Sequence, residues 1–332
     1  MGHSAIAIID DYQGVALRAA DWSPVAAQAD LQVFNRPWRD EDEIARELAR
    51  FDIVVLMRER TAFPAPLIAR LPRLRLIAMT GHRTTTLDLA ACTQRGIVVS
   101  HTTANPSSAP AELAFALILA CARALPQAHA NVLRGAWEDG LPMGVPLEGK
   151  RLGIVGLGKL GSKVARYGRA FGMEVVAWSQ NLTADAAAAK GVRRIDKDEL
   201  FATSDVVSVH LALSERSLRI IGHAEFAAMK DGAIFVNTSR GPLADETALL
   251  EALRSGRLWA GLDVFDVEPL PRDRPLVSLS NVVLTPHLGY VVADTMERFY
   301  RDSVENILAY LRGTPIRVAN PDVRPPAAHS PA

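Results

Sequence analysis

The sequence is poor in three features that would point to particular protein classes: cysteine, net charge and long apolar runs. Lysine plus arginine and aspartate plus glutamate each number 37, so no charge excess favours nucleic acid or an acidic membrane as a partner. The only two cysteines, Cys92 and Cys121, stand in apolar surroundings without the spacing of metal ligands. We therefore expect no metal site and interpret both cysteines as reduced core thiols of a cytoplasmic protein.

The sequence shows no pattern typical of a membrane-spanning or targeting segment. No basic stretch followed by an apolar one opens the chain, so no signal peptide is expected, and Ile6 stands where N-myristoylation requires Ser or Thr. The most apolar stretch, at 113–122, is far shorter than the roughly 20 residues of a bilayer-spanning helix. Because this stretch is apolar on nearly every side, we expect a helix buried in a core or in a subunit interface.

Two series of short β-rich segments alternate with helical segments, and the 332 residues are enough for two domains. The expected strands are 5–10, 31–35, 52–57, 75–80 and 96–101, then 151–156, 174–179, 205–211, 233–239, 258–265 and 281–286. Alternation of this kind predicts an α/β fold with parallel sheets covered by helices on both faces. The Pro- and Gly-rich segment 141–150 is expected to connect the two series.

The second series opens with the letters GLGKLG, which match the G-x-G-x-x-G pattern of dinucleotide-binding loops. Gly156 permits the tight turn, Gly158 lets the backbone approach a pyrophosphate, and Gly161 allows close packing of helix on strand. Lys159 and Leu160 open the helix whose N-terminus would face the anion. The alternative is a tight strand–helix turn that binds nothing, which the preceding strand and the helical spacing that follows disfavour.

The position that usually contacts the adenosine ribose lacks its acid. An NAD-type site places Asp or Glu about 20 residues after the glycines, and this chain has Ser179, Gln180 and Asn181 there. Ser or Asn could bond the ribose 2′-hydroxyl, neither repels a 2′-phosphate, and no arginine stands beside them to attract one. We expect NAD(H) or NADP(H) as cofactor, without strict selectivity for NAD(H).

Three later motifs complete a recognisable set: NTSRG at 237–241, GLDVFDVEP at 261–269 and TPHLG at 285–289. Together with the glycine loop, they resemble the D-isomer-specific 2-hydroxyacid dehydrogenases, which include phosphoglycerate dehydrogenase and glyoxylate/hydroxypyruvate reductase. The resemblance extends over most of the chain. It implies an oxidoreductase that transfers a hydride between a nicotinamide cofactor and a small D-2-hydroxy acid or 2-keto acid.

The resemblance also implies an organisation into two domains. We expect a flavodoxin-like substrate-binding domain made of residues 1–103 and 289–332, and a Rossmann dinucleotide-binding domain at 104–288. Members of this family are typically homodimers, so the long apolar helix near 112–125 is expected in the subunit interface. Nicotinamide and substrate are expected between the two domains.

Individual roles follow from the resemblance. Arg240 corresponds to the arginine that holds the substrate carboxylate and carbonyl oxygen, His287 to the catalytic acid/base, and Glu268 to its carboxylate partner. Asp263 resembles the residue that binds the nicotinamide carboxamide, and Thr238 is expected along the cofactor. The chemistry agrees: a developing alkoxide needs a preorganised positive partner, and histidine exchanges a proton near neutral pH. Taken singly, each residue could be structural, but the joint pattern favours the catalytic interpretation.

The stretch TGHRTTTLD at 80–88 departs from the family, whose Gly-Val-Gly-x-Asn-type loop binds the substrate carboxylate through backbone N–H groups. Gly81 keeps one backbone approach, whereas His82 and Arg83 add bulk and charge. Arg83 either helps bind an acidic substrate, which we favour, or points to solvent. Tyr290 places an aromatic ring where many relatives have a small residue. We interpret His210, at the end of a strand, as a packed structural histidine.

The main alternative is a nicotinamide-responsive binding protein, like the transcriptional corepressors that share this fold. The balanced charge and the complete set of Arg240, Glu268 and His287 favour an enzyme. Glu268 also disfavours formate dehydrogenase, where the resemblance implies Gln. The motifs do not name the acid that the enzyme uses.

Overall fold

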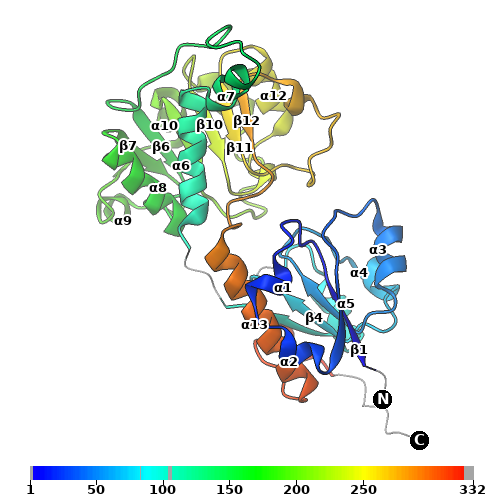
Figure 1. The fold of residues 1–332 in the computed structure, drawn as a ribbon. Helices are drawn as coiled ribbons and strands as arrows, with labels where there is room; N and C mark the ends of the chain where they lie inside the picture. Colours follow the sequence, from blue (N-terminus) through cyan, green and yellow to red (C-terminus); the bar gives the residue numbers. More distant parts are fainter. Residues whose placement is uncertain (1–2, 83, 104–106, 325–332) are drawn as a thin grey trace, which may run out of the picture. The chain divides into compact units, whose positions relative to one another are not determined.

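The computed structural model describes residues 3–82, 84–103 and 107–324, and the chain divides into two compact units (Figure 1). The terminal unit combines Met1–Pro106 with Val292–Ala332, and the central unit is Ser107–Val291. These divisions fall three residues after each of the two expected boundaries, at 103/104 and 288/289. The α/β fold class is confirmed, because both units are parallel sheets with interspersed helices.

The terminal unit is built on a five-stranded sheet in the order β2-β1-β3-β4-β5. This order is that of flavodoxin-like folds. The strands are β1 (Ser4–Ile8), β2 (Ala29–Val33), β3 (Ile53–Leu56), β4 (Leu76–Met79) and β5 (Val98–His101). The helices are α1 (Ala16–Ala19), α2 (Ser23–Ala26), α3 (Glu41–Leu48), α4 (Ala65–Ala69), α5 (Leu89–Gln94) and α13 (Ala293–Leu311). Every residue of β3 and β4 is buried, as expected for parallel strands that helices cover on both faces.

The central unit is built on a seven-stranded parallel sheet in the order β12-β11-β10-β9-β6-β7-β8. Its strands are β6 (Arg151–Val155), β7 (Glu174–Trp178), β8 (Arg193–Arg194), β9 (Val206–Val209), β10 (Ile234–Asn237), β11 (Trp259–Leu262) and β12 (Val282–Leu284). The first strand, β6, lies inside the sheet with β7 on one side and β9 on the other, which is the Rossmann arrangement with one extra strand. Sequence analysis missed β8, because two exposed arginines carry no strand pattern.

Helices connect and cover these strands (Figure 1). They are α6 (Ala109–Ala122), α7 (Leu125–Leu133), α8 (Lys159–Ala170), α9 (Ala184–Ala188), α10 (Lys197–Thr203), α11 (His223–Ala228) and α12 (Glu246–Arg254), with 3-10 turns η1 (Gly241–Leu243) and η2 (Pro275–Ser278). In the described part of the chain, no single helix is long and apolar enough to cross a membrane. Only α6 and α7 taken together reach that length and composition, across a bend of 63°.

The apolar helix α6 lies in the core of the central unit. Phe115, Leu117, Ile118 and Cys121 are buried there, and the helix packs against α8, β10 and β11. The unit's own core therefore buries much of this helix, which is one of the two settings expected for it, while Leu113 and Leu119 are only partly buried. The expected place of the helix in a subunit interface stays a prediction. The exposed large apolar side chains of this region lie further along, on α7 and the segment after it: Leu125, Val132, Leu133, Trp137 and Met143.

Both cysteines are unpaired and buried, as expected for core thiols. Burial raises the pKa of Cys92 and of Cys121 to about 12. Since the thiolate is the reactive form, neither side chain is suited to nucleophilic chemistry at neutral pH.

Candidate active site

The glycine loop follows β6, where the order of the central sheet reverses. Gly156 has φ of +103°, and a Cβ there would lie 2.8 Å from the carbonyl oxygen of His210. A Cβ on Gly161 would lie 2.1 Å from the carbonyl oxygen of Gly156, so α8 can approach the loop only because Gly161 has no side chain. Around Gly158, by contrast, no atom lies within 4 Å of the Cβ position. The loop is thus tight at its two ends and open in the middle, at the N-terminus of α8, which fits a pyrophosphate.

The end of β7 lies against this loop. The Gly156 N–H donates to the Trp178 carbonyl at 2.8 Å, which places Ser179 beside the glycines. One residue further on, the Gln180 side chain donates to the carbonyl of Arg216 at 2.9 Å, and the Arg216 guanidinium lies 3.5 Å from Asn181 Oδ1. Our expectation that no arginine stands beside these residues is wrong. Arg216 comes from the segment after β9, and only the fold brings it there.

His287 and Glu268 form a short polar contact at the edge of the central sheet where the strands end. His287 Nδ1 lies 2.6 Å from Glu268 Oε2, while Glu268 Oε1 accepts the Phe265 N–H at 2.9 Å. The carboxylate is therefore fixed through both oxygens, and it fixes the imidazole in turn. With Nδ1 engaged by Glu268, Nε2 is the ring nitrogen left to exchange a proton with a substrate. The ring of Tyr290 packs edge-on against His287, with centroids 5.6 Å apart.

Asp263, the first residue after β11, is fully buried and accepts three hydrogen bonds from the TPHLG segment. The donors are the Thr285 hydroxyl at 2.6 Å, the Leu288 N–H at 2.7 Å and the Gly289 N–H at 2.9 Å. Burial raises the pKa of Asp263, and these donors oppose that rise. Asp263 thus clamps the residues on both sides of His287, a contact that the motif did not reveal.

Arg240 follows β10, the neighbour of β11 in the sheet. The Asn237 side chain donates to the Arg240 carbonyl at 2.9 Å, and the Arg240 guanidinium donates to the Ser239 carbonyl at 2.6 Å. A Cβ on Gly241 would lie 2.2 Å from the carbonyl carbon of Phe265, so the Arg240 turn packs directly on the segment that leads to Glu268. Thr238 is half-buried in the same turn.

Arg240, Glu268 and His287 therefore follow three adjacent parallel strands, β10, β11 and β12, at one edge of the sheet. The sequence motifs named these residues, and the sheet order explains why they belong to one edge, since carboxyl ends of parallel strands meet there.

His210 follows β9 and lies behind the glycine loop. Its N–H donates to the Val155 carbonyl at 2.7 Å, and its Nε2 lies 2.9 Å from the Ser208 hydroxyl. Surrounding atoms desolvate the ring and lower the pKa of His210 to about 4, although part of the residue's surface stays exposed. A ring that is neutral at physiological pH, on a residue whose backbone carbonyl packs against Gly156, agrees with a structural role.

In the terminal unit, Gly81 follows β4. Its N–H donates to the Thr102 hydroxyl at 2.7 Å, so this N–H is already engaged within the unit. The Arg58 guanidinium lies next to it, 3.6 Å from the position of a Cβ on Gly81. Arg58 follows β3, the neighbour of β4, and sequence analysis missed it, although the adjacency of strand ends could have indicated it. His82 is exposed, and Arg83 lies outside the described residues.

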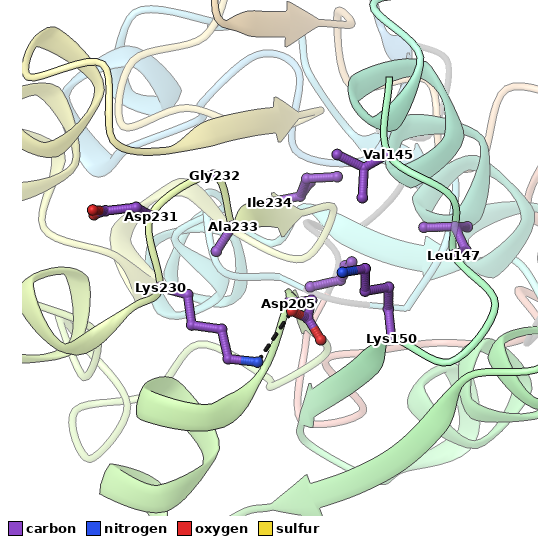
Figure 2. A pocket seen from close by; sticks show the side chains of 10 residues that line it. Val145, Leu147, Lys150, Asp205, Lys230, Asp231, Gly232, Ala233 and Ile234 are labelled. Carbon is purple, nitrogen blue, oxygen red and sulfur yellow. Dashed lines mark hydrogen bonds and ion pairs between the residues drawn. The ribbon is translucent and has the colours of Figure 1, made fainter. Parts of the chain in front are cut away.

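A cavity of about 140 Å³ lies at the opposite edge of the central sheet (Figure 2). Asp205 and Lys230, which come just before β9 and β10, line it and form an ion pair at 3.0 Å. Lys150, just before β6, also lines it. The strand ends that carry the glycine loop and His287 are at the other edge. The cavity is too small for a dinucleotide and is not part of the candidate active site.

The decisive comparison concerns the central unit. Residues 115–289, more than half of the chain, match the family model described as the NAD binding domain of D-isomer specific 2-hydroxyacid dehydrogenases. This chain belongs to that family. The motifs at 237–241, 261–269 and 285–289 therefore occur in the family setting that sequence analysis predicted for them.

Two curated relatives show the range of the family. The chain is 39% identical over 276 residues to a hydroxypyruvate reductase of Thermotoga maritima, covering 82% of this chain and 89% of the relative. It is 37% identical over 290 residues to a D-3-phosphoglycerate dehydrogenase of Archaeoglobus fulgidus, covering 87% of this chain and 55% of the relative. The chain thus spans about half the length of the latter dehydrogenase.

Solved structures agree with this family membership. A phosphoglycerate oxidoreductase from Vibrio cholerae superposes with a TM-score of 0.88 at 37% identity, covering 93% of this chain and 99% of the other. Two more distant structures contain a nicotinamide cofactor. One is a D-lactate dehydrogenase from Aquifex aeolicus with NAD and lactic acid, at 27% identity and a TM-score of 0.72 over 93% of this chain and 96% of the other. The second is an acyclic imino acid reductase with NADPH and D-arginine, at 27% identity and a TM-score of 0.70 over 95% of this chain and 99% of the other.

Proposed function

We propose that this protein is a nicotinamide-dependent D-2-hydroxyacid dehydrogenase that interconverts a small 2-keto acid and the corresponding D-2-hydroxy acid. The bond of 2.6 Å between His287 and Glu268 carries the proposal, because it orients an acid/base at the strand edge that also bears Arg240. Membership of the family and the names of the relatives support it. A 2-keto acid with two or three carbons is the class suggested by the relatives named hydroxypyruvate and glyoxylate reductase.

In this proposal the central unit binds the dinucleotide. The open middle of the glycine loop at Gly158 and the N-terminus of α8 take the pyrophosphate, and Lys159, Leu160 and Thr238 lie along it. The bound cofactor supplies or accepts the hydride. The central unit is therefore the dinucleotide-binding domain, and the terminal unit, with Gly81 and Arg58, is the substrate-binding domain.

The proton belongs to His287. During reduction, Nε2 of the imidazolium gives its proton to the oxygen that becomes the hydroxyl, and in oxidation the neutral ring takes it back. The Glu268 carboxylate on Nδ1 keeps the ring in one orientation and stabilises the imidazolium. The guanidinium of Arg240 can donate two parallel hydrogen bonds to the substrate carboxylate and oxygen. Asp263 acts as a positioning residue for the His287 segment, beside its expected contact with the nicotinamide carboxamide.

Substrate selection is proposed to depend on the terminal unit. The Gly81 N–H is engaged by Thr102 and so is a poor donor to the substrate. Arg58, which lies next to Gly81 and forms an ion pair with Glu59 at 3.3 Å, is the cation proposed to attract the substrate carboxylate instead. Arg83 remains a proposed contributor, in addition to Arg58.

We further propose a cytoplasmic homodimer. Two reduced buried thiols suit the cytoplasm. The exposed apolar side chains on α7 and after it, including Leu133 and Trp137, offer a surface for a second copy, and Leu119 of α6 is only partly buried within its own unit.

A screen of small 2-keto acids with NADH and NADPH, followed by the absorbance of the reduced cofactor, tests the activity. The expected result is turnover of at least one two- or three-carbon 2-keto acid. A nicotinamide-responsive binding protein is the competing function. It would bind the cofactor and turn over no acid, and that outcome would overturn the proposed activity.

A further inference from the structure

Two arginines contact the segment that follows β7, and a lysine contacts the glycine loop beside it. The Lys190 ammonium donates to the Leu157 carbonyl of the glycine loop at 2.6 Å. Arg194 of β8 donates from Nε to the Leu182 carbonyl at 3.1 Å. From the segment after β9, Arg216 lies 3.5 Å from the Asn181 side chain. None of these contacts is with a carboxylate of the segment, because residues 179–182 contain no acid.

A carboxylate neutralises one of these cations, because Asp196 lies 3.1 Å from Arg194. Within the described residues, no carboxylate is hydrogen-bonded to Ser179, Gln180 or Asn181, and the side chains of Gln180 and Asn181 contact Arg216. The place where an NAD-type site carries an acid therefore has an exposed arginine beside it instead.

We propose that this region selects the 2′-phosphate of NADP(H), with Ser179, Asn181 and Arg216 as the residues that determine the preference over NAD(H). This inference rests on the proposed function, because it requires the dinucleotide to lie on the glycine loop. Ser179 directly follows β7 and is placed beside the loop by the bond between Gly156 and Trp178. A carboxylate at that position would repel a phosphate dianion, whereas a hydroxyl can donate to it.

The side chain of Arg216 is exposed and its bond to Asn181 is long, so it can turn towards a phosphate with little loss. Its backbone is held independently, because the Gln180 side chain donates to the Arg216 carbonyl at 2.9 Å. The backbone of Arg216 therefore stays near the expected position of the ribose, while its guanidinium can exchange the contact with Asn181 for a contact with a phosphate. A planar guanidinium can offer two parallel N–H groups to a phosphate.

Calorimetric titration of the full chain with NADPH and with NADH tests the proposal without relying on turnover. We expect NADPH to bind about tenfold more tightly or better, the scale of one charge-assisted contact. Arg216→Gln is expected to weaken NADPH binding by about tenfold and leave NADH binding within about twofold. Arg193→Gln is the matched control, since exposed Arg193 forms ion pairs with Glu174 and Glu199.

Two further measurements sharpen the result. Ser179→Asp is expected to reverse the order of the two affinities by repelling the phosphate, and salt is expected to weaken NADPH binding more than NADH binding. Tighter binding of NADH than of NADPH by the wild type, or an equal loss for both cofactors in Arg216→Gln, would overturn the proposal. Failure of both cofactors to bind the wild type would instead overturn the proposed function.

Discussion

Each unit buries an aspartate just past the end of a strand, and the two carboxylates differ in how they are satisfied. Asp263 follows β11 and accepts three hydrogen bonds from the segment that carries His287. Asp10, two residues after β1, has φ of +61° and accepts the Thr61 hydroxyl at 2.8 Å and, more weakly, the Tyr12 hydroxyl at 3.4 Å. Burial dominates there and raises the pKa of Asp10 to about 6.

The difference shows what each edge is built for. In the central unit, a carboxylate with a full set of donors holds the candidate acid/base in one place, as precise proton transfer requires. In the terminal unit, a poorly solvated acid with fewer donors accompanies the loops proposed to contact the substrate. Backbone strain does not separate the two edges, because φ is positive at Asp10 and Arg58 and also at His287. The first edge carries the motifs that this chain shares with the family, and the second carries the stretch at 80–88 that departs from the family pattern.

The largest expected effect is the loss of the imidazole held by the central unit. His287→Ala removes the proposed general acid and is expected to lower kcat by about 10²–10⁴-fold, with little change in the affinity for the cofactor. Steady-state rates and cofactor titration measure the two quantities. His223→Ala is the control, because His223 is an exposed histidine paired with Glu251 at 3.2 Å. Near-normal turnover of His287→Ala would contradict the acid/base assignment.

Substitution of Asp263 tests how much the activity depends on the hydrogen bonds that hold the segment carrying His287. Asp263→Ala leaves three donors around Thr285, Leu288 and Gly289 without their acceptor. We expect kcat to fall by about 10–100-fold and the free energy of unfolding to fall by about 2–4 kcal/mol, the cost of unmade buried hydrogen bonds. Chemical denaturation and rates measure both. A stable, fully active variant would show that the His287 segment holds its own conformation.

The pH profile tests the pair formed by His287 and Glu268. Reduction requires a protonated His287 and oxidation a neutral one, so the two rates are expected to change with pH in opposite directions. Glu268→Gln keeps the shape but removes the charge that favours the imidazolium, so reduction is expected to lose more rate at alkaline pH than at acidic pH. Rates across pH for the wild type and the variant measure this. An unchanged pH dependence would argue against the pairing in solution.

A smaller effect is expected at the edge of the terminal unit. Arg58→Gln removes a positive charge beside Gly81 and is expected to raise KM for the keto acid by about 5–20-fold, with a smaller change in kcat, if Arg58 attracts the substrate carboxylate. Saturation kinetics with one keto acid decide this. Arg73→Gln serves as the control, because Arg73 is exposed and pairs with Asp52. Equal KM values for Arg58→Gln and the wild type would leave Arg58 with a structural role only.

The smallest effect concerns stability and follows from Asp10. Its pKa of about 6 in the folded protein exceeds the ordinary 3.8, so its stabilising contribution is complete below about pH 4 and is lost as pH rises through about 6. Asp10→Asn removes this titration and tolerates the positive φ. The variant is expected to be more stable than the wild type at pH 8, by on the order of 1–3 kcal/mol, and similar at pH 4. Denaturation curves at both pH values measure this, and parallel pH dependences would contradict it.

Local patterns predicted much of the architecture. All of the expected strands are present, because buried parallel strands read as short β-branched runs between helical segments. The glycine loop could also be predicted from the sequence, because the backbone leaves no room for a Cβ at Gly156 or Gly161 and therefore requires glycine at both positions. Strand β8 could not be predicted from the sequence, because its two residues are exposed arginines and give no pattern of buried apolar side chains.

Contacts between residues that lie far apart in the sequence could be identified only from the tertiary structure. Arg216 reaches Asn181 across 35 residues, and Arg58 reaches Gly81 from the neighbouring strand, because parallel sheets gather the carboxyl ends of strands at one edge. The same principle made Asp263 a clamp for the segment that carries His287. Residue types and short spacings determined which chemistry the chain carries. Which side chain stands beside which depends on the order of the strands, and no local stretch of sequence encodes that order.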